Sequence, residues 1–150
     1  MGATTTVLTN TGSATNNKLF SILVPAGTVG NNDFIEVIAM FRRTAGTASG
    51  GTLNAYFNET DDLTTPQQVG TIGVGSGTQV GTIRMVQKWI NATNSTIGFP
   101  QHGMVAVSGG APYTTTIDNT ADFYIIFTIQ NGSALDTWTL YFGTATLYKV

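Results

Sequence analysis

The stretch GTIGVGSGTQVGTI, residues 70–83, is where the composition most strongly suggests chemistry, because five of its fourteen residues are glycine. Glycine-rich loops cradle phosphates when a lysine follows, as in GxxxxGK[ST], or when GxGxxG joins a buried strand to a helix. No lysine lies between Lys18 and Lys88, the central glycines form only GxGxG, and a second strand pattern follows. Nucleotide binding is therefore not expected here.

The same stretch alternates in a way that is typical of two strands joined by a turn. Ile72 and Val74 come before the Gly-Ser-Gly at residues 75–77, and Val80 and Ile83 come after it. Glycine adopts the backbone conformations that tight turns need without steric cost. We therefore predict a hairpin of small residues, which is also a candidate contact with another subunit.

His102, in GFPQHGM, is the only histidine of the chain. A Ser–His–Asp triad would need this imidazole, but no serine occupies a GxSxG elbow. A metal site with one histidine would need carboxylates nearby, and the nearest acid in the sequence is Asp118. We expect His102 to be a turn residue near a subunit contact.

Asp61 and Asp62 are the most suggestive acids, because Glu59 lies close by and calcium prefers carboxylate oxygens. Adjacent residues of an extended chain point to opposite sides, however, and so the two aspartates do not converge by themselves. We predict a solvated loop rather than a cation site. No pair of acids has a spacing that identifies the two carboxylates of a glycosidase.

Four aromatic residues could stack on sugar rings if they were exposed together: Trp89, Trp138, Tyr113 and Tyr124. Both tryptophans lie in phase with apolar neighbours, which predicts that they are buried in the core. The sequence thus predicts no catalytic, cofactor-binding or metal-ligating residues, and we expect a protein that is not an enzyme.

The elements that position these residues are short runs with a period of two, which is typical of strands. The predicted strands cover residues 18–25, 33–43, 52–59, 82–90, 121–130 and 136–150. A helix is the competing interpretation for 33–43, but its β-branched residues and flanking turns favour a strand. Runs 33–41 and 121–129 are apolar on both faces, which leaves surface for association to bury.

The alternation predicts which side chains of each strand face the core. In 52–59 we expect Leu53, Ala55 and Phe57 to point inward, and Asn54, Tyr56 and Asn58 to point outward. In the last run, Trp138, Leu140 and Phe142 share a face, and the phase changes at Gly143. Glycine within a strand often marks a bulge, and so we predict one at Gly143.

Composition excludes several classes of protein. The chain has six Lys and Arg residues against eight Asp and Glu, a formal net charge of −2, and no cysteine. No basic stripe is present to bind nucleic acid, no thiol can form a disulfide, and no run approaches the roughly 20 apolar residues of a membrane span. The first residues lack the basic start and apolar run of a signal peptide.

Abundant Thr, Gly, Asn and Ser, with few Glu and Lys, predict an all-β chain. About eight or more short strands, turns every 8–12 residues and no fixed repeat indicate an antiparallel β-sandwich or barrel. The eight-stranded jelly roll is the first choice and an immunoglobulin-like sandwich the second. We expect an N-terminal arm at residues 1–17 and a single β-sandwich domain at residues 18–150.

Three segments resemble a family of phage virion β-sandwich domains. KLFSILVPAGTVGNNDFIEVIAMFRR is similar to its opening, LFS-x-x-[IV]-PA-[GN]-[ST]-x-G-x-[ND], and QKWINATNSTIGFP to its middle. TIDNTADFYIIFTIQNGSALDTWTLYFGTATLYKV is similar to its end, with a hydrophobic strand, a D-T-[IW]-T-L turn and a closing strand. The matching residues are Leu19, Phe20, Ser21, Pro25, Ala26 and Gly30 in the opening, and Asp136, Thr137, Thr139 and Leu140 at the close. The Gly-rich stretch 44–81 departs from the family pattern.

The resemblance implies a jelly-roll-like subunit of a phage particle, since such domains occur in tail fibres, tailspikes, head fibres and capsid decoration proteins, commonly as trimers. We expect a virion protein, made in the host cytoplasm, that forms homotrimers and binds other virion proteins such as the major capsid protein. The Thr-rich arm, residues 1–17, is a candidate anchor that adds a strand to a partner. The alternative is a receptor- or glycan-binding module of a tail fibre, with binding loops at 58–65 and 109–116. Neither nucleic acid nor membrane is expected as a partner.

Overall fold

A computed structural model describes residues 3–4, 8–11, 15–46, 50–77, 80–91, 95–102 and 113–150 of the chain. Side chains are described for 15–46, 50–77 and 116–150, and for Val80, Thr82, Arg84 and Val86. Within this part of the chain no helix is long and apolar enough to cross a membrane.

The described residues form strands and turns, and all of the strand pairs are antiparallel. The prediction of an all-β chain is confirmed. The strands are β1 (Ala3–Thr4), β2 (Leu8–Thr11), β3 (Asn17–Val24), β4 (Phe34–Ala45), β5 (Gly51–Asn58), β6 (Gln67–Val74), β7 (Val80–Asn91), β8 (Ser95–His102), β9 (Tyr113–Thr116), β10 (Phe123–Asn131) and β11 (Thr137–Tyr148).

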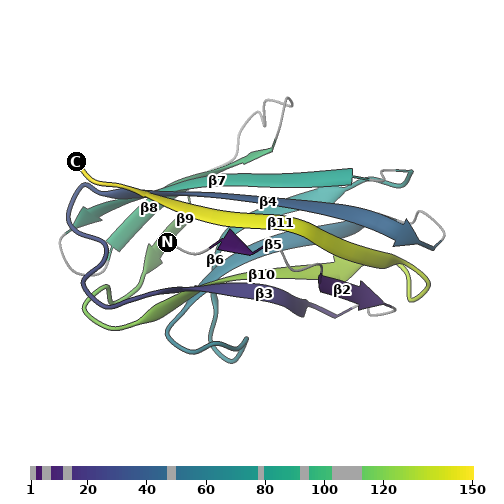
Figure 1. Cartoon of the computed structure of the whole chain (residues 1–150), viewed down its shortest axis with the longest axis horizontal. Helices are drawn as coiled ribbons and strands as arrows, with labels where there is room; N and C mark the ends of the chain where they lie inside the picture. The colour runs from purple at the N-terminus through teal and green to yellow at the C-terminus, as the bar shows by residue number, and fades with distance from the viewer. Residues whose placement is uncertain are drawn as a thin grey trace.

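The strands form two sheets that lie face to face. The larger sheet has the order β1-β11-β4-β7-β8-β9, with β2 also paired to β11, and the smaller sheet has the order β3-β10-β5-β6. Figure 1 shows these layers, with β4, β7 and β11 in one and β3 and β10 in the other. Most consecutive strands lie in different sheets, and so the chain crosses repeatedly from one layer to the other.

The core lies between the layers and follows the predicted alternation of β4 and β10. Alternate residues of β4 from Ile35 to Phe41 are fully buried, and so are alternate residues of β10 from Phe123 to Ile129. Phe20 of β3 stacks on Phe127 of β10 with ring centroids 4.7 Å apart. Two-residue periodicity places every second side chain on the core face, which is why these strands form the centre of each sheet.

Strand β11 contains a bulge, but the predicted position at Gly143 is wrong. Leu140 pairs with Phe41 and Phe142 pairs with Met40, which makes Tyr141 the extra residue. Phe142 therefore points outward, with 39% of its surface exposed, whereas the sequence pattern placed it in the core beside Leu140. Gly143 then lies on the core face, directly against the ring of Phe20.

The predicted hairpin at residues 70–83 is also wrong. β6 pairs with β5 in the smaller sheet, while β7 pairs with β4 and β8 in the larger sheet, so the two strands do not pair with each other. The turn at Gly75–Gly77 carries the chain from one layer to the other, with Gly77 in a left-handed conformation at φ 86°. Alternation alone identifies two strands and a turn, and it does not reveal which sheet each strand joins.

The prediction for β5 is correct on one face and wrong on the other. Leu53, Ala55 and Phe57 are fully buried, but Asn54, Tyr56 and Asn58 are also buried, at 4%, 9% and 4% exposure. Hydrogen bonds explain the burial of Asn54, whose Oδ1 accepts from Gln68 Nε2 at 2.9 Å and from Thr71 Oγ1 at 2.7 Å. Asn54 Nδ2 in turn donates to Asn16 Oδ1 at 3.0 Å. Burial of polar groups costs little when each finds a partner.

The N-terminal strands belong to the larger sheet. β2 pairs with β11 from Leu8–Leu140 to Thr11–Thr137, and β1 pairs with β11 at residues 143 and 144. Part of the predicted arm, residues 1–17, therefore occupies the edge of β11 in its own chain.

One amide side chain joins the edges of the two sheets. Gln67 of β6 accepts a hydrogen bond on Oε1 from the backbone N–H of Thr116 in β9 at 2.8 Å, and its Nε2 donates to the carbonyl oxygen of the same residue. The side chain thus pairs with β9 as another peptide group would, and it holds the smaller sheet to the larger one at this edge.

Candidate functional site

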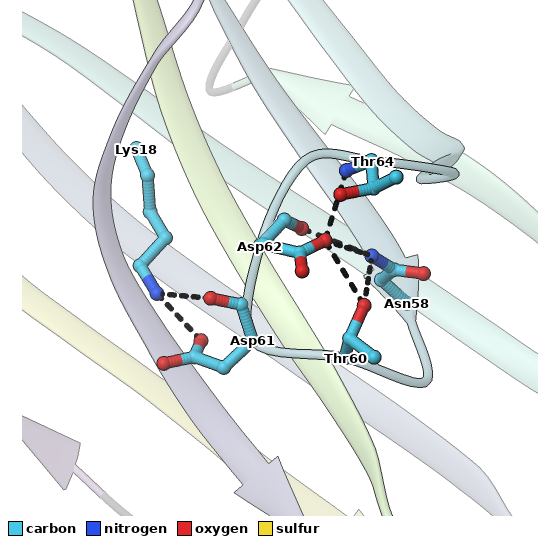
Figure 2. Close-up of polar contacts among 6 residues, drawn as sticks. All are labelled: Lys18, Asn58, Thr60, Asp61, Asp62 and Thr64. Carbon is cyan, nitrogen blue, oxygen red and sulfur yellow. Dashed lines mark hydrogen bonds and ion pairs between the residues drawn. The ribbon is translucent and has the colours of Figure 1, made fainter.

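The loop after β5 contains the acids that the sequence singled out, and Asp62 organises it. Asp62 Oδ1 accepts hydrogen bonds from the backbone N–H of Thr64 at 2.9 Å, from Thr60 Oγ1 at 2.9 Å and from Asn58 Nδ2 at 3.2 Å (Figure 2). The bond from Thr64 N–H, together with those from the Thr60, Thr64 and Asn58 side chains, holds the pKa of Asp62 below its usual 3.8. Asp62 therefore acts as an internal cap that fixes the loop.

Asp61 points the other way and binds a different strand. Lys18 Nζ lies 2.7 Å from Asp61 Oδ1 and donates to the Asp61 backbone carbonyl at 2.8 Å, which pins the loop to β3 (Figure 2). Burial raises the pKa of Asp61, but hydrogen bonds from Lys18 and Ser21 and the charge of Lys18 outweigh it and lower the pKa below 3.8. The two aspartates diverge as their adjacency predicts, and each is engaged in structural contacts.

A cation site needs several ligands directed at one point. Across the described ranges, no group of three or more His, Cys, Asp and Glu side chains lies close enough to hold a metal ion.

Asp33 joins the turn before β4 to the C-terminus. Its carboxylate accepts hydrogen bonds from Gly30 N–H at 2.8 Å and from Val150 N–H at 3.2 Å, and it pairs with Lys149 Nζ at 2.8 Å. Only 5% of the Asp33 side chain is exposed. Burial raises its pKa, but the bonds from Lys149, Gly30 and Val150 together outweigh that effect, and the pKa lies below 3.8.

Replacing Asp33 with Asn should destabilise the protein by about 2 kcal/mol near neutral pH, because charge-assisted bonds to a buried carboxylate are lost. A carboxyl group with a lowered pKa stabilises the fold above its unfolded pKa and stops doing so as the pH falls through its folded pKa. The stability difference between wild type and Asp33→Asn should therefore be constant above about pH 5 and shrink below pH 3.8. Urea unfolding at several pH values measures this stability difference. A difference that does not change with pH would contradict a stabilising role for the charged Asp33 carboxylate.

Two other acids, Asp118 and Asp122, also accept hydrogen bonds from backbone or hydroxyl groups that lie close to them. Asp118 Oδ1 accepts from the N–H and hydroxyl of Thr120 at 2.8 Å and 2.6 Å, which lowers the pKa of Asp118 below 3.8. Asp122 Oδ1 accepts from Ala26 N–H at 2.7 Å. These acids are distributed among turns at different places in the fold, and they do not converge on a cleft.

The remaining candidates of the sequence fall into two groups. Trp138 is fully buried, as its phase predicts, and Tyr124 is half-buried on β10. The side chains of Trp89, His102 and Tyr113 lie outside the described residues, as does most of the loop 109–116. The backbone places His102 at the end of β8, paired with Ile83 of β7.

The outer face of the larger sheet carries a feature that the residue-by-residue search missed. Phe34, Ile38, Met40, Phe142 and Tyr148 form what we term the outer apolar patch, on β4 and β11. Met40 and Phe142 are cross-strand partners, each 39% exposed, and Tyr148 is 40% exposed. The ring of Tyr148 stacks on that of Phe34 with centroids 4.6 Å apart. The sequence signal for this patch is the run 33–41, which is apolar on both faces.

A charged group borders this patch. Glu36 accepts from Arg84 Nε at 2.6 Å and from the Tyr148 hydroxyl at 3.1 Å. The bond to Glu36 and its negative charge raise the pKa of the Tyr148 hydroxyl above 10. The Glu36 carboxylate is thus paired with a cation, and the face keeps its largely apolar character.

Comparisons with known proteins do not identify a family for this chain. No protein-family model matches the chain, and no curated protein matches it. A similar solved structure is the CBM2 module of Lactobacillus casei BL23 phage J-1 evolved Dit, with 8% sequence identity and a TM-score of 0.39. The similarity covers 83% of this chain and 66% of that chain, so this chain spans slightly less than two thirds of its neighbour. Values of this size indicate neither a shared family nor a shared activity.

Proposed function

We propose that the chain is a non-enzymatic structural protein of a phage virion, a trimeric capsid decoration or head-fibre subunit made in the host cytoplasm. The motif residues that resemble the virion family support this proposal through their structural roles. Phe20 and Leu140 are core residues, Ala26 bonds to Asp122, and Gly30 bonds to Asp33. A pattern of core and turn residues is what a shared architecture requires, and it carries no catalytic group.

The strand order supports a jelly roll within this proposal. Neighbours β2-β11-β4-β7 make up one set of four strands and β3-β10-β5-β6 the other, with β1, β8 and β9 added to the larger sheet. An eight-stranded jelly roll is a double-sheet arrangement of two Greek keys. The order favours this fold over the immunoglobulin-like alternative, because β10 and β11 lie in different sheets, whereas the last two strands of an immunoglobulin-like sandwich share one.

The outer apolar patch is the observation that carries the proposal of self-association. Side chains such as Met40 and Phe142 present contiguous apolar surface on two neighbouring strands, and the adjacent Glu36 is already paired with Arg84. Contiguous exposed apolar surface on a soluble protein commonly marks an interface. Packing this face against other copies would bury it, as closed symmetric oligomers do.

Wild-type protein should therefore have three times the chain mass of 15.8 kDa in multi-angle light scattering, and Met40→Glu should shift it to monomer. A carboxylate introduced into an apolar interface loses hydration without gaining a partner. Leu23→Glu is the matched control, since Leu23 is 44% exposed on the smaller sheet and should leave the trimer intact. A monomeric wild type would contradict the trimer, and a trimeric Met40→Glu would show that the patch is not the interface.

Anchoring by residues 1–17 is the remaining part of the proposal. Because β1 and β2 already pair with β11, an anchor that adds a strand to a partner must either exchange this pairing or use the rest of the arm. The test is a chain that lacks residues 2–17. If this chain melts at the wild-type temperature and still occupies its sites on the particle fully, the anchoring role of the arm is contradicted.

The alternative function is a receptor- or glycan-binding module of a tail fibre. In the candidate loop 58–65, Asn58 and Asp62 bond to one another and Asp61 binds Lys18, which favours a structural role for this loop. A glycan array with competition for host-cell adsorption separates the two functions. Binding and competition together would favour the module, and their absence would favour the structural protein.

A further inference from the structure

A pocket opens where β4 ends. It has a volume of about 390 Å³ and is lined by Arg42, Arg43, Thr44, Ala45 and Gly46. The position of Thr44 is irregular, because Thr137 pairs with Ala45 and Trp138 with Arg43, so that one residue of β4 is skipped. Two consecutive arginines thus lie at a break in the pairing of the strand.

Arg42 and Arg43 lack the ion pairs that the other cations with described side chains form. Lys18 pairs with Asp61, Arg84 with Glu36 and Lys149 with Asp33. Neither Arg42 nor Arg43 forms an ion pair, although every acid of the chain lies in the part whose side chains are described. In a chain with 9% charged residues, two lining residues that are cations without ion pairs give this end of β4 a positive charge.

Two buried donors on cross-strand partners at this end of β4 also lack acceptors. Arg43 Nη1 is buried and has no hydrogen-bond partner, and so is the indole Nε1 of Trp138. The two residues are direct cross-strand partners, whose Cβ atoms lie about 5 Å apart in such a pairing. Buried donors are normally satisfied, and the unsatisfied Nη1 of Arg43 indicates a site that requires acceptor oxygens.

The nearest acid does not fill this role. A Cβ atom at Gly46 would lie 2.2 Å from Asp136 Oδ1, and so this carboxylate lies directly against Gly46. Asp136 is fully buried and takes part in interactions of its own.

We propose that the pocket lined by Arg42–Gly46 binds an oxyanion, a carboxylate or phosphate group, through the guanidinium of Arg43. Guanidinium presents paired N–H donors that match the two oxygens of such a group. The volume suits a ligand the size of a sugar acid or a sugar phosphate. This site is independent of the virion proposal, because it depends only on the local geometry and charge.

Nuclear magnetic resonance of the arginine Nε–Hε groups in the full-length chain tests the proposal. The probes are glucuronate, glucose 1-phosphate, inorganic phosphate and uncharged glucose. The three anions should produce saturable shifts at Arg43, with a dissociation constant on the order of 1 mM, and glucose should produce none. Tighter binding of the sugar anions than of inorganic phosphate would show that the pocket recognises the sugar as well as the oxyanion. Equal binding would show that it recognises the oxyanion group alone.

The double variant Arg42→Gln/Arg43→Gln should weaken binding at least tenfold, which the backbone amide signals of Thr44–Gly46 measure because the arginine signals are lost. Arg84→Gln is the control, since that arginine is paired with Glu36. Arg43→Lys keeps the charge and removes the paired donors, and so should retain only part of the affinity. The melting temperature of each variant shows whether a loss of binding is caused by a loss of fold. Shifts that do not saturate, shifts of equal size with glucose, or affinity unchanged in the double variant would each overturn the proposal.

Discussion

Gly143→Ala is expected to destabilise the protein by about 3 kcal/mol, because the added methyl group has no space. A Cβ atom at this position would lie 2.2 Å from Cζ of Phe20 and within 3 Å of two other atoms of that ring. The ring cannot simply move away, since it is buried and stacked on Phe127. Against a typical total stability of about 5–15 kcal/mol, this is a large loss. Urea unfolding of the purified protein measures it.

Gly73→Ala is the matched control for this change. Gly73 is also a strand glycine, but it is exposed on β6 and has no atom within 4 Å of its Cβ position. Its substitution should be neutral or slightly stabilising, because alanine restricts the unfolded chain more than glycine does. If Gly143→Ala were no more destabilising than Gly73→Ala, the close packing of Phe20 on β11 would be contradicted.

Gly46→Ala is expected to cost at least about 3 kcal/mol, through backbone strain and steric overlap together. Gly46 has φ 113°, a conformation that residues with a side chain rarely adopt. Its Cβ would also lie 2.5 Å from Cα of Asp136 and 2.6 Å from the carbonyl oxygen of Leu135. These are backbone atoms of the turn before β11, and they move less easily than a side chain.

Gly77→Ala separates the two causes. Gly77 has φ 86° and nothing within 4 Å of its Cβ position, and so its substitution reports the strain alone, about 1–2 kcal/mol. The difference between the two variants measures the steric overlap at Gly46. Equal unfolding free energies would show that the turn before β11 does not pack against Gly46 as the structure has it.

Local periodicity was enough to predict the core faces of the central strands. Every second residue is buried from Ile35 to Phe41 in β4 and from Phe123 to Ile129 in β10, because this part of each central strand faces the opposite sheet. Pairing partners were not predictable, since β6 and β7 follow one another in sequence but join different sheets. Glycine was a misleading bulge signal at Gly143, where its small size serves the packing of Phe20.

In the candidate site, too, local sequence patterns do not predict which distant residues come into contact. The divergence of Asp61 and Asp62 follows from their adjacency, but the partner of Asp61 is Lys18, which is 43 residues away. Similarly, the burial of Asn54 depends on Asn16, Gln68 and Thr71, which come from two separate segments, the residues before β3 and strand β6. A polar residue on a strand predicts exposure only when nothing else in the chain covers that face.

The repeated crossing of the chain between layers has a kinetic consequence. β11 pairs with β4, which begins about a hundred residues earlier, and β10 pairs with β3 across a similar separation. Few pairings can therefore form before distant parts of the chain have met, and each requires a long loop to close first. Proteins dominated by such pairings fold in milliseconds to seconds rather than microseconds. During synthesis, β4 is made before both of its partners, β7 and β11, and its apolar faces are exposed until these strands arrive.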